Sequence, residues 1–394
     1  MFFDLSEEHL AVRDAARDFA QKDLKPGVIE RDSKMIYPTE QVKMMGELGF
    51  LGMMVSPEYG GGGMDTLSYV LAMEEISKVD SSCSVIMSVN NSLVCWGIEA
   101  FGTEEQKRKY LPKLVTGEWL GSFCLSEPEA GSDATSQRTT AVDMGDYYLL
   151  NGTKNWITSG GKSKLHIVMA QTDAAAGHRG INAFLVETSW DGVAIGAKED
   201  KLGIRASDTH TIMYTDVKVP KENRIGEDGF GFKFAMKTLE GGRIGIASQA
   251  LGIAGGAYEL ALEYSKERKA FGKPISQHQA IAFKLADMAT EIEAAKLMVY
   301  RAAWLKDQQM DYSTASAMAK LYASEVAMKH TVEAVQIHGG YGYVKEYHVE
   351  RLMRDAKITQ IYEGTSEVQR IVISRDILNG QVYLPVLPFA EAKV

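Results

Sequence analysis

The sequence lacks a basic excess, a cysteine cluster and a long apolar run. Its 394 residues carry 43 Lys and Arg against 52 Asp and Glu, and the formal net charge of −9 argues against a general nucleic-acid surface, which would be basic. No apolar run approaches the ~20 residues that a membrane-spanning helix needs. The three cysteines, Cys83, Cys95 and Cys124, lie far apart without CxxC spacing. We therefore expect a reducing compartment and no metal site.

The sequence also has no dinucleotide-binding fingerprint, and we expect no signal peptide. The Gly60–Gly63 run follows no predicted strand, and neither a GxGxxG nor a Walker pattern occurs, so we predict a surface loop there. The N-terminal MFFDLSEEHL is acidic and has no basic n-region, which predicts that it is not a signal peptide.

Patterning predicts an α+β protein in three parts. Residues 1–122 read as an N-terminal all-α domain, with an N-cap at Ser6 and a capping box at Thr103–Gln106. Residues 123–231 are rich in β-branched and aromatic residues and predict a middle antiparallel β-domain, with a hairpin turn at Asn151-Gly152. Residues 232–394 predict a C-terminal α-bundle domain.

Two long helices carry the evidence for the bundle. The segment from Ser276 to Gln309 contains no proline or glycine, and its apolar residues are spaced 4, 3, 4, 3, 4, as in a bundle seam. The seam residues are Ile281, Leu285, Met288, Ile292, Ala295 and Val299. A second helix is predicted from about Ser313 to Ile337, ending at Gly339-Gly340. The tail after Leu378 has little periodicity, so we expect it to be extended.

Two segments near the middle of the chain could bind a ligand. CLSEPEAGSDATS (Cys124–Ser136) gathers hydroxyl residues and a glycine in a turn, which either presents N–H and O–H donors to a ligand or caps a strand. TKNWITSGG (Thr153–Gly161) places Trp156 at a predicted strand end beside Thr158. An indole can stack on a planar cofactor, and a half-buried strand tryptophan is the structural alternative.

Two later segments could bind phosphate. SKERKAFGKPISQHQ (Ser265–Gln279) places Arg268 at a helix end, where a cation either complements the helix dipole or recognises phosphate. AVQIHGGYGYVKEY (Ala334–Tyr347) is dense in glycine after a long helix, and exposed amides in such a loop can bind a diphosphate. His338 alone predicts a structural histidine.

The fifth segment, QIYEGTSEVQR (Gln360–Arg370), holds a carboxylate just before a helix. Thr365 is a good N-cap for a helix that starts at Ser366. The apolar side of this helix is predicted to contain Val368, Ile371, Val372 and Leu378. Glu363 lies outside the helix, and Gly364 permits a backbone geometry that turns it away. It is either an acid near the positive end of a helix dipole or the base of an enzyme.

Taken in order, these five segments resemble the acyl-CoA dehydrogenase family. The pattern is LSEP–AGSD, WIT, RKAFGKPI–Q, QIHGGYGY and QIYEGTSEVQR, and the resemblance runs from the LSEEH helix through Leu378. The fold it implies is an all-α domain, an antiparallel β-domain and a C-terminal four-helix bundle. The segment LEGGRIGIASQALGIA looks most like that of short-chain, butyryl-CoA members.

The resemblance implies FAD, held without a dinucleotide fold. Ser126 would bond the pyrimidine side of the flavin, Trp156 would pack near it, and Thr158 would bond N5. Arg268, Gln279 and the loop from Gln336 to Gly340 would hold the diphosphate and adenosine of FAD in a neighbouring subunit. The implied cofactor-binding residues are Phe123, Leu125, Ser126, Gly131, Ser132, Trp156, Ile157, Thr158, Arg268, Phe271, Gln279, Gln336, Ile337, Gly339, Gly340, Thr365 and Glu367.

The implied reaction is α,β-dehydrogenation of a short-chain acyl-CoA to the trans-2-enoyl-CoA. Glu363 would abstract the α-proton while the β-hydrogen leaves as hydride to flavin N5. The Glu363 N–H and a ribityl hydroxyl would bond the thioester oxygen, an oxyanion-hole arrangement. The positions that match substrate contacts are Ser132, Glu240, Arg243, Tyr362 and Gly364.

A second carboxylate, Glu240, is a rival for the role of base. Some branched-chain members carry their base immediately before the arginine of TLEGGRIGIA, and that position is Gly242 here. Glu240 is two residues further back, and because a helix turns ~100° per residue it points elsewhere. Glu363 is therefore the predicted base. Short branched substrates, isobutyryl- or 2-methylbutyryl-CoA, stay open because the sequence does not show the acyl-pocket floor.

The resemblance also implies partners and a location. We expect a homotetramer built as a dimer of dimers, and an electron-transferring flavoprotein as electron acceptor. The protein would belong to the cytoplasm of a bacterium or the mitochondrial matrix of a eukaryote, in fatty-acid β-oxidation or amino-acid catabolism. Two other functions are open: a flavin oxidase or monooxygenase on the same scaffold, and a non-catalytic acyl-CoA- or partner-binding protein. Glu363 and the flavin-loop residues speak against the last.

Overall fold

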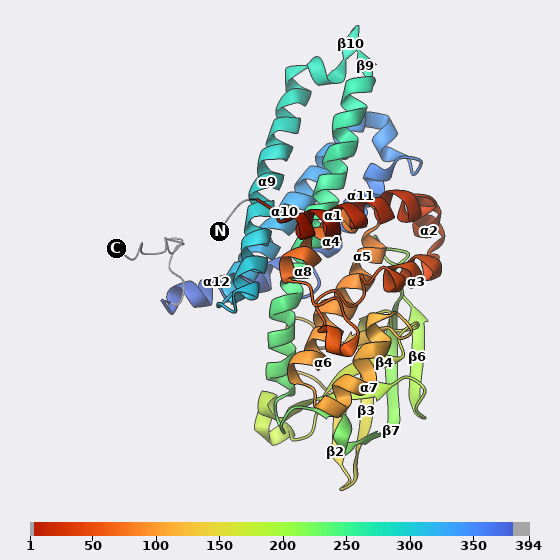
Figure 1. Cartoon of the computed structure of the whole chain (residues 1–394), viewed down its shortest axis with the longest axis vertical. Coiled ribbons are helices and arrows are strands. Elements are labelled where there is room, and N and C mark those ends of the chain that lie inside the picture. The colour runs from red at the N-terminus through yellow and green to blue at the C-terminus, as the bar shows by residue number, and fades with distance from the viewer. Residues whose placement is uncertain (1–3, 381–394) are drawn as a thin grey trace.

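The N-terminal part of the chain is helical, as predicted. A computed structural model describes residues 4–380 (Figure 1). Ser6 accepts a hydrogen bond from the His9 N–H, and the predicted capping box of Thr103 and Gln106 is present, so both predicted helix starts are confirmed. The helices of this part are α1 Glu7–Phe19, α2 Val28–Lys34, α3 Thr39–Glu47, α4 Thr66–Val79, α5 Ser81–Ser88, α6 Trp96–Phe101 and α7 Glu104–Val115.

The middle part is one twisted sheet. Its strands are β1 Gly121–Cys124, β2 Thr140–Asp143, β3 Tyr147–Thr158, β4 Leu165–Gln171, β5 Ile181–Glu187, β6 Val193–Lys198, β7 Thr209–Pro220 and β8 Arg224–Ile225. They pair in the order β6-β7-β3-β2-β4-β5-β8, with β1 added to β4. Most pairings are antiparallel, as predicted, but β4 pairs in parallel with both β1 and β2.

The predicted hairpin at Asn151-Gly152 is wrong. Both residues lie inside β3, where a register shift against β7 marks a bulge. A Cβ at Gly152 would lie 2.4 Å from Oγ1 of Thr139, so glycine allows the close approach of the neighbouring chain. Asn151 bonds Asp216 across the bulge, accepting from its N–H at 2.8 Å and donating to its carboxylate at 3.0 Å. The Asn-Gly pair serves a bulge here because the tertiary neighbours replace the local turn.

The C-terminal part is a bundle of long helices. They are α8 Gly231–Glu267, α9 Gln279–Asp307, α10 Ser313–His338, α11 His348–Ile358 and α12 Ser366–Leu378, and the short hairpin β9 Lys269–Ala270 and β10 Lys273–Pro274 joins α8 to α9. The predicted seam of α9 is buried from Leu285 to Val299, and Ile281 is partly buried against the same core. The tail predicted to be extended lies outside the described residues beyond Gly380. The domain boundaries at 122/123 and 231/232 stay predictions.

The apolar side predicted for α12 is confirmed at Val372 and wrong at Ile371 and Leu378. Its buried residues are Ser366, Gln369, Val372 and Asp376. Ile371 and Leu378 are 64% and 84% exposed. The helix therefore turns a mixed polar face toward the chain and leaves apolar residues outside.

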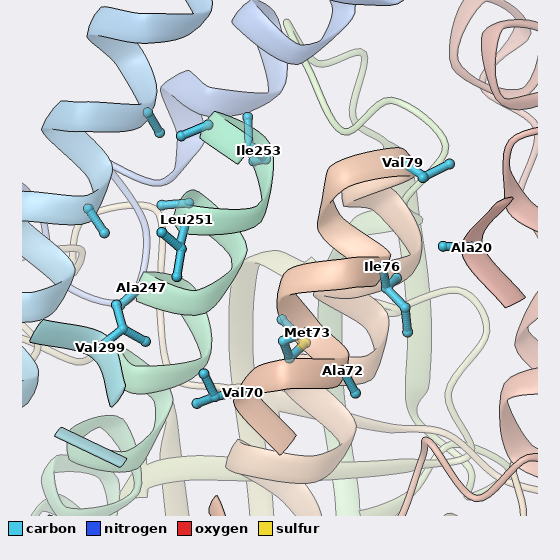
Figure 2. Packing of buried hydrophobic residues seen from close by; sticks show 14 of the residues in the cluster. Ala20, Val70, Ala72, Met73, Ile76, Val79, Ala247, Leu251, Ile253 and Val299 are labelled. Carbon is cyan, nitrogen blue, oxygen red and sulfur yellow. The ribbon is translucent and has the colours of Figure 1, made fainter. Parts of the chain in front are cut away.

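The long helix α8 connects the sheet to the far end of the molecule. At 1.5 Å per residue its 37 residues span about 55 Å. Figure 1 shows it running from the sheet to the β9–β10 hairpin. In Figure 2 the side chains of α4 lie between Ala20 on one side and Ala247, Leu251 and Ile253 of α8 on the other, within the main hydrophobic cluster.

Within residues 4–380, no helix has the length and apolar character required to cross a membrane. The same residues contain no group of three or more His, Cys, Asp or Glu side chains suited to a metal ion.

Glycines of α8 allow this helix to pack closely against α4. A Cβ at Gly252 would lie 2.3 Å from the Glu74 carbonyl oxygen, whereas a Cβ at Gly255 meets only the flexible Lys78 side chain at 3.4 Å. Gly252→Ala should therefore lower the free energy of unfolding by about 1–3 kcal/mol through overpacking. Gly255→Ala, the matched control, should be neutral or gain up to about 1 kcal/mol from helix propensity. Denaturant unfolding measures both, and equal stabilities would contradict the close contact.

Candidate active site

Glu363 lies in the short loop between α11 and α12 in a strained backbone conformation. Its φ is 50° and that of Gly364 is 88°, so two consecutive residues occupy the left-handed region. A non-glycine residue there costs on the order of 1–2 kcal/mol. Thr365 then caps α12 by accepting from the Val368 N–H, as predicted. This left-handed backbone conformation turns the Glu363 side chain away from the helix that follows it.

The carboxylate of Glu363 points at the backbone of α8. A Cβ placed on Gly242 would lie 2.4 Å from Oε2 of Glu363 and 2.8 Å from Cδ2 of Leu93. Oε2 is buried and has no hydrogen-bond partner within residues 4–380. Burial raises the pKa of Glu363 to about 7, although the positive charges of Lys320 and Arg243 lower it. A carboxyl group with this pKa can accept a proton near neutral pH.

The backbone of the loop is held by side chains from two helices. Lys320 of α10 donates to the Gly364 carbonyl at 2.6 Å. Gln369 of α12 donates to the same carbonyl at 2.9 Å and to the Glu363 carbonyl at 3.4 Å. The N–H of Glu363, by contrast, has no backbone acceptor in the described part of the chain. The carbonyl oxygens are thus occupied while this donor is free for a ligand.

The other predicted substrate-binding residues near the loop differ in their hydrogen-bond partners. Arg243 is 8% exposed, and its Nε and Nη1 find no partner in the described structure. Burial lowers the pKa of its guanidinium, opposed by Glu240. Glu240 accepts from Ser313 at 3.3 Å and does not join the carboxylate of Glu363. Tyr362 donates its hydroxyl to Gln249 of α8.

A second group of predicted residues gathers where β1 meets β3. The loop after β1 is tied to β3 by the Asn155 N–H, which donates to the Ser126 carbonyl at 2.9 Å. Lys154 lies beneath this loop, fully buried, and donates to the Leu125 carbonyl at 3.1 Å, to Glu127 at 2.7 Å and to Gln137 at 3.0 Å. These bonds fix the loop backbone from below.

Trp156 and Thr158 end β3 at a second bulge. The register against β7 shifts between Lys154 and Ile157, and Trp156 has a φ of 63°. Trp156 is 62% exposed, so it is not the half-buried strand tryptophan of the structural alternative. The Thr158 carbonyl accepts from Ser122, and the buried side-chain oxygen of Asn155 finds no hydrogen-bond partner in the part of the chain that the structure describes. An exposed indole on a strained bulge, beside an unpaired acceptor, favours a ligand surface.

The β1–β3 group and the Glu363 loop share one hydrophobic cluster. Leu93 and Leu125 are members of it, and Phe123 and Tyr362 pack against it. Leu93 also lies beside Gly242 and hence beside the Glu363 carboxylate. The residues predicted to hold the flavin ring and the predicted base therefore belong to one region, at the contact between sheet and bundle.

A third group lies at the opposite end of α8. Arg268 ends that helix and stands over the Tyr341 ring at 5.3 Å. A pocket of about 650 Å³ there is lined by both predicted and unpredicted residues: Tyr264, Arg268, Ile275, Ile337, His338, Gly339, Gly340, Tyr341, Val344 and Glu346. Phe271, 96% exposed with a φ of 53°, tips the nearby hairpin. Figure 1 shows this end far from the sheet.

Several of the predicted cofactor-binding residues lie at the surface of the chain. Gly131, Ser132, Gln279, Gln336 and Glu367 are exposed. A Cβ at Gly131, Gly339 or Gly340 would meet nothing within 4 Å, so these glycines leave open space beside their backbones. His338 is structural, as expected: it is buried, bonds the Ala334 carbonyl at 2.8 Å and stacks on Tyr264.

Sequence reasoning missed the side chains that support the site. Lys320, Lys154 and Gln369 are fully buried and bond backbone carbonyls of the predicted ligand loops. A signal existed for Lys320, because it stands in a stretch of small residues at helical spacing, Ser316, Ala317, Ala323, Ser324 and Ala327, which are buried with it. A charge within a small-residue stripe indicates a buried ion.

The residues present fit a flavin dinucleotide. The exposed indole and the side-chain oxygen of Asn155, which has no hydrogen-bond partner among residues 4–380, provide an aromatic surface and an acceptor at the end of β3. Arg268 and the open glycine backbone of 339–340 provide a cation and amides suited to a diphosphate.

Comparison with known proteins agrees with these features. Three family models match in order: "Acyl-CoA dehydrogenase, N-terminal domain" at residues 6–118, "Acyl-CoA dehydrogenase, middle domain" at 122–217 and "Acyl-CoA dehydrogenase, C-terminal domain" at 229–378. The short-chain specific acyl-CoA dehydrogenase of Clostridium acetobutylicum is 51% identical over 377 residues, covering 96% of this chain and 100% of the relative.

Two solved structures are similar over nearly the whole chain. Butyryl-CoA dehydrogenase from Megasphaera elsdenii superimposes with a TM-score of 0.95 at 50% identity, covering 96% of this chain and 100% of that one. A chain in a structure of the electron transferring flavoprotein of Acidaminococcus fermentans has a TM-score of 0.95 at 52% identity, with the same coverage.

The raised pKa of Glu363 predicts a pH-dependent cost in stability. Its folded value of about 7 exceeds its ordinary value of 4.5, so the stabilising proton is lost as pH rises through 7. Without substrate, Glu363→Gln should be more stable than the parent at pH 8 by up to about 3 kcal/mol, and by under about 1 kcal/mol at pH 5. Denaturant unfolding at both pH values measures this.

The matched control is Glu367→Gln, four residues along. Glu367 is exposed and its pKa is lowered, first by a backbone hydrogen bond, so its substitution should bring no gain at pH 8. Equal behaviour of the two variants would contradict the burial of the Glu363 carboxyl.

Proposed function

This chain belongs to the acyl-CoA dehydrogenase family, and we propose that it oxidises short-chain acyl-CoA thioesters such as butyryl-CoA to trans-2-enoyl-CoA with FAD. Members of the family are flavoproteins and generally FAD-dependent oxidoreductases. The short-chain preference is supported by relatives about 50% identical over almost their whole length, which carry short-chain and butyryl-CoA names.

The observation that carries the proposal is the Glu363 carboxylate. Its Oε2 is buried with no hydrogen-bond partner among residues 4–380 and lies against a glycine of α8, and the carboxyl has a pKa of about 7. An α C–H is a very weak acid, so a base must be desolvated and held against it. Glu363 takes the α-proton onto Oε2, the oxygen that lies against the bare backbone at Gly242.

The polarisation of the thioester is the second task of the same loop. The Glu363 N–H is free, while Lys320 and Gln369 occupy the loop carbonyls. This N–H donates to the thioester oxygen and stabilises the negative charge that develops there. Loss of one such donor costs roughly 3 kcal/mol in well-studied oxyanion holes.

Residues of the β-domain hold the flavin end of the cofactor, which when bound accepts the β-hydrogen as hydride. The loop Phe123, Leu125 and Ser126, supported by Lys154, contributes backbone and hydroxyl groups. Trp156 covers one surface and Thr158 contributes its hydroxyl. Thr365 and Glu367 act from the start of α12.

A second copy of the chain completes this site. Arg268, Phe271, Gln279 and the loop Gln336–Gly340 lie toward the C-terminal end of α8, a helix about 55 Å long that begins against Asn182 of the sheet. They hold the diphosphate and adenosine of the cofactor bound by a neighbouring subunit. The assembly is a homotetramer arranged as a dimer of dimers.

Electrons then leave to an electron-transferring flavoprotein, a partner suggested by the solved structure in which a 52% identical chain occurs. The location that fits this acceptor is the bacterial cytoplasm or the mitochondrial matrix.

Glu363→Gln tests the base. The amide is isosteric and cannot accept the proton, so FAD should stay bound while the rate of flavin reduction by butyryl-CoA falls by several orders of magnitude. Stopped-flow absorbance measures the rate. Reduction at near the parent rate would show that Glu363 is not the base.

Two measurements on the parent enzyme test the alternative functions. Rapid reoxidation by air with peroxide release would indicate an oxidase. A faster reaction with isobutyryl- or 2-methylbutyryl-CoA than with butyryl-CoA would indicate a branched-chain enzyme.

Gly242→Ala tests the position of the carboxylate. The new Cβ would stand 2.4 Å from Oε2, so the side chain must move and flavin reduction should fall about 10–100-fold. Gly241→Ala is the control, because its Cβ meets only the Lys306 ammonium at 3.6 Å and the Tyr312 hydroxyl at 4.0 Å. Equal rates in the two variants would refute this placement of the base.

A further inference from the structure

Lys320 is a buried cation placed directly behind the Glu363 loop. It is 0% exposed on α10, and its single hydrogen bond within the described residues goes to the Gly364 carbonyl, at 2.6 Å. An ammonium group loses several kcal/mol of hydration when buried, and one neutral carbonyl does not restore that. Packing alone therefore does not account for a lysine at this position.

The charges around the loop indicate that function. Glu363 faces Lys320 from the loop and Arg243 from α8, and these two cations lower its pKa against the effect of burial. Tyr69 of α4 and Tyr362 are the neutral titratable groups nearby; burial raises the pKa of both, and the charge of Glu363 raises it further. Lys320 itself faces Glu363, Glu325 and Glu367, with Arg243 as the like charge.

We propose that Lys320 is a positioning residue for the base: its ammonium fixes the Gly364 carbonyl, and its charge favours the ionised form of Glu363. This rests on the proposed function of Glu363. The hydrogen bond holds the left-handed pair Glu363-Gly364, which keeps the Glu363 N–H facing the ligand. The charge counteracts desolvation, so that the carboxylate exists at the pH where the enzyme works.

The two effects of Lys320 are separable by substitution. Lys320→Gln keeps a hydrogen-bond donor and removes the charge, Lys320→Met removes both, and Lys320→Arg keeps both. The measurement is kcat/KM for butyryl-CoA with an artificial electron acceptor over about pH 5.5–9, which reports the pKa of the base in the free enzyme.

The acid limb of this profile should move in a defined order. The base is active when ionised, so removing a neighbouring positive charge moves the limb to higher pH. Lys320→Gln and Lys320→Met should both shift it upward by about one pH unit, and Lys320→Arg should leave it in place. Lys320→Met should also lower the plateau, because the loop carbonyl loses its donor. FAD content and the flavin spectrum show whether each variant is loaded.

Lys306→Met is the matched control. Lys306 on α9 is another lysine whose pKa burial lowers to about 8, as it does for Lys320, and its Nζ contacts the Met54 sulfur at 3.9 Å. It does not contribute to the pKa of Glu363. The acid limb of the Lys306→Met profile should stay at the same pH as that of the parent enzyme.

The outcomes separate this proposal from the function it rests on. If Glu363→Gln is inactive and the limb stays in place in Lys320→Gln and Lys320→Met, the Lys320 proposal is wrong and the base stands. An active Glu363→Gln overturns the base and the Lys320 proposal together. If Lys320→Met fails to bind FAD, the limb of Lys320→Gln decides.

Discussion

The contact between the Glu363 carboxylate and the bare backbone at Gly242 is the constraint on which the site depends. Because glycine has no side chain, Oε2 reaches a buried position where no group of residues 4–380 bonds it. Burial there raises the pKa of the carboxyl to about 7. A side chain at 242 would remove both the space and the desolvation, so the helix residue and the loop residue act as one unit.

Holding a carboxylate in this way costs stability, and the surrounding elements offset the cost. The loop needs two consecutive left-handed residues, which a short connection between α11 and α12 would not adopt alone. Lys320 and Gln369 bond its carbonyls, and Thr365 caps the helix that leaves it. The rigid partner is α8, which glycines such as Gly252 allow to lie close to α4. The position of the base is thus inherited from helix packing.

Local patterns in the sequence predicted the features that depend on local physics. The seam of α9 follows from burial of one helical stripe, and the caps at Ser6, Thr103 and Thr365 follow from the orphan N–H groups of a helix start. Asn151-Gly152 and the outer side of α12 were misjudged because tertiary neighbours decide them. The bulge of β3 against β7 uses the same glycine that a turn would, because Thr139 approaches it closely, and α12 buries Gln369, which bonds the Glu363 loop.

The sequence motifs predicted which segments form the site. They did not predict how these segments are arranged in space. The motif order identified the loop of Glu363, but Lys320 and Lys154 act on backbone carbonyls distant in sequence, and no local pattern encodes such contacts. The length of α8 adds a constraint that only geometry supplies. Helix α8 begins at Gly231 against Asn182 of the sheet, and Arg268 follows its other end, so the sheet residues and the Arg268 group proposed to bind the cofactor lie toward opposite ends of the chain's fold. If both groups bind the same kind of cofactor, each must meet the opposite group on another copy. Under the proposed function, assembly is therefore a condition of cofactor binding.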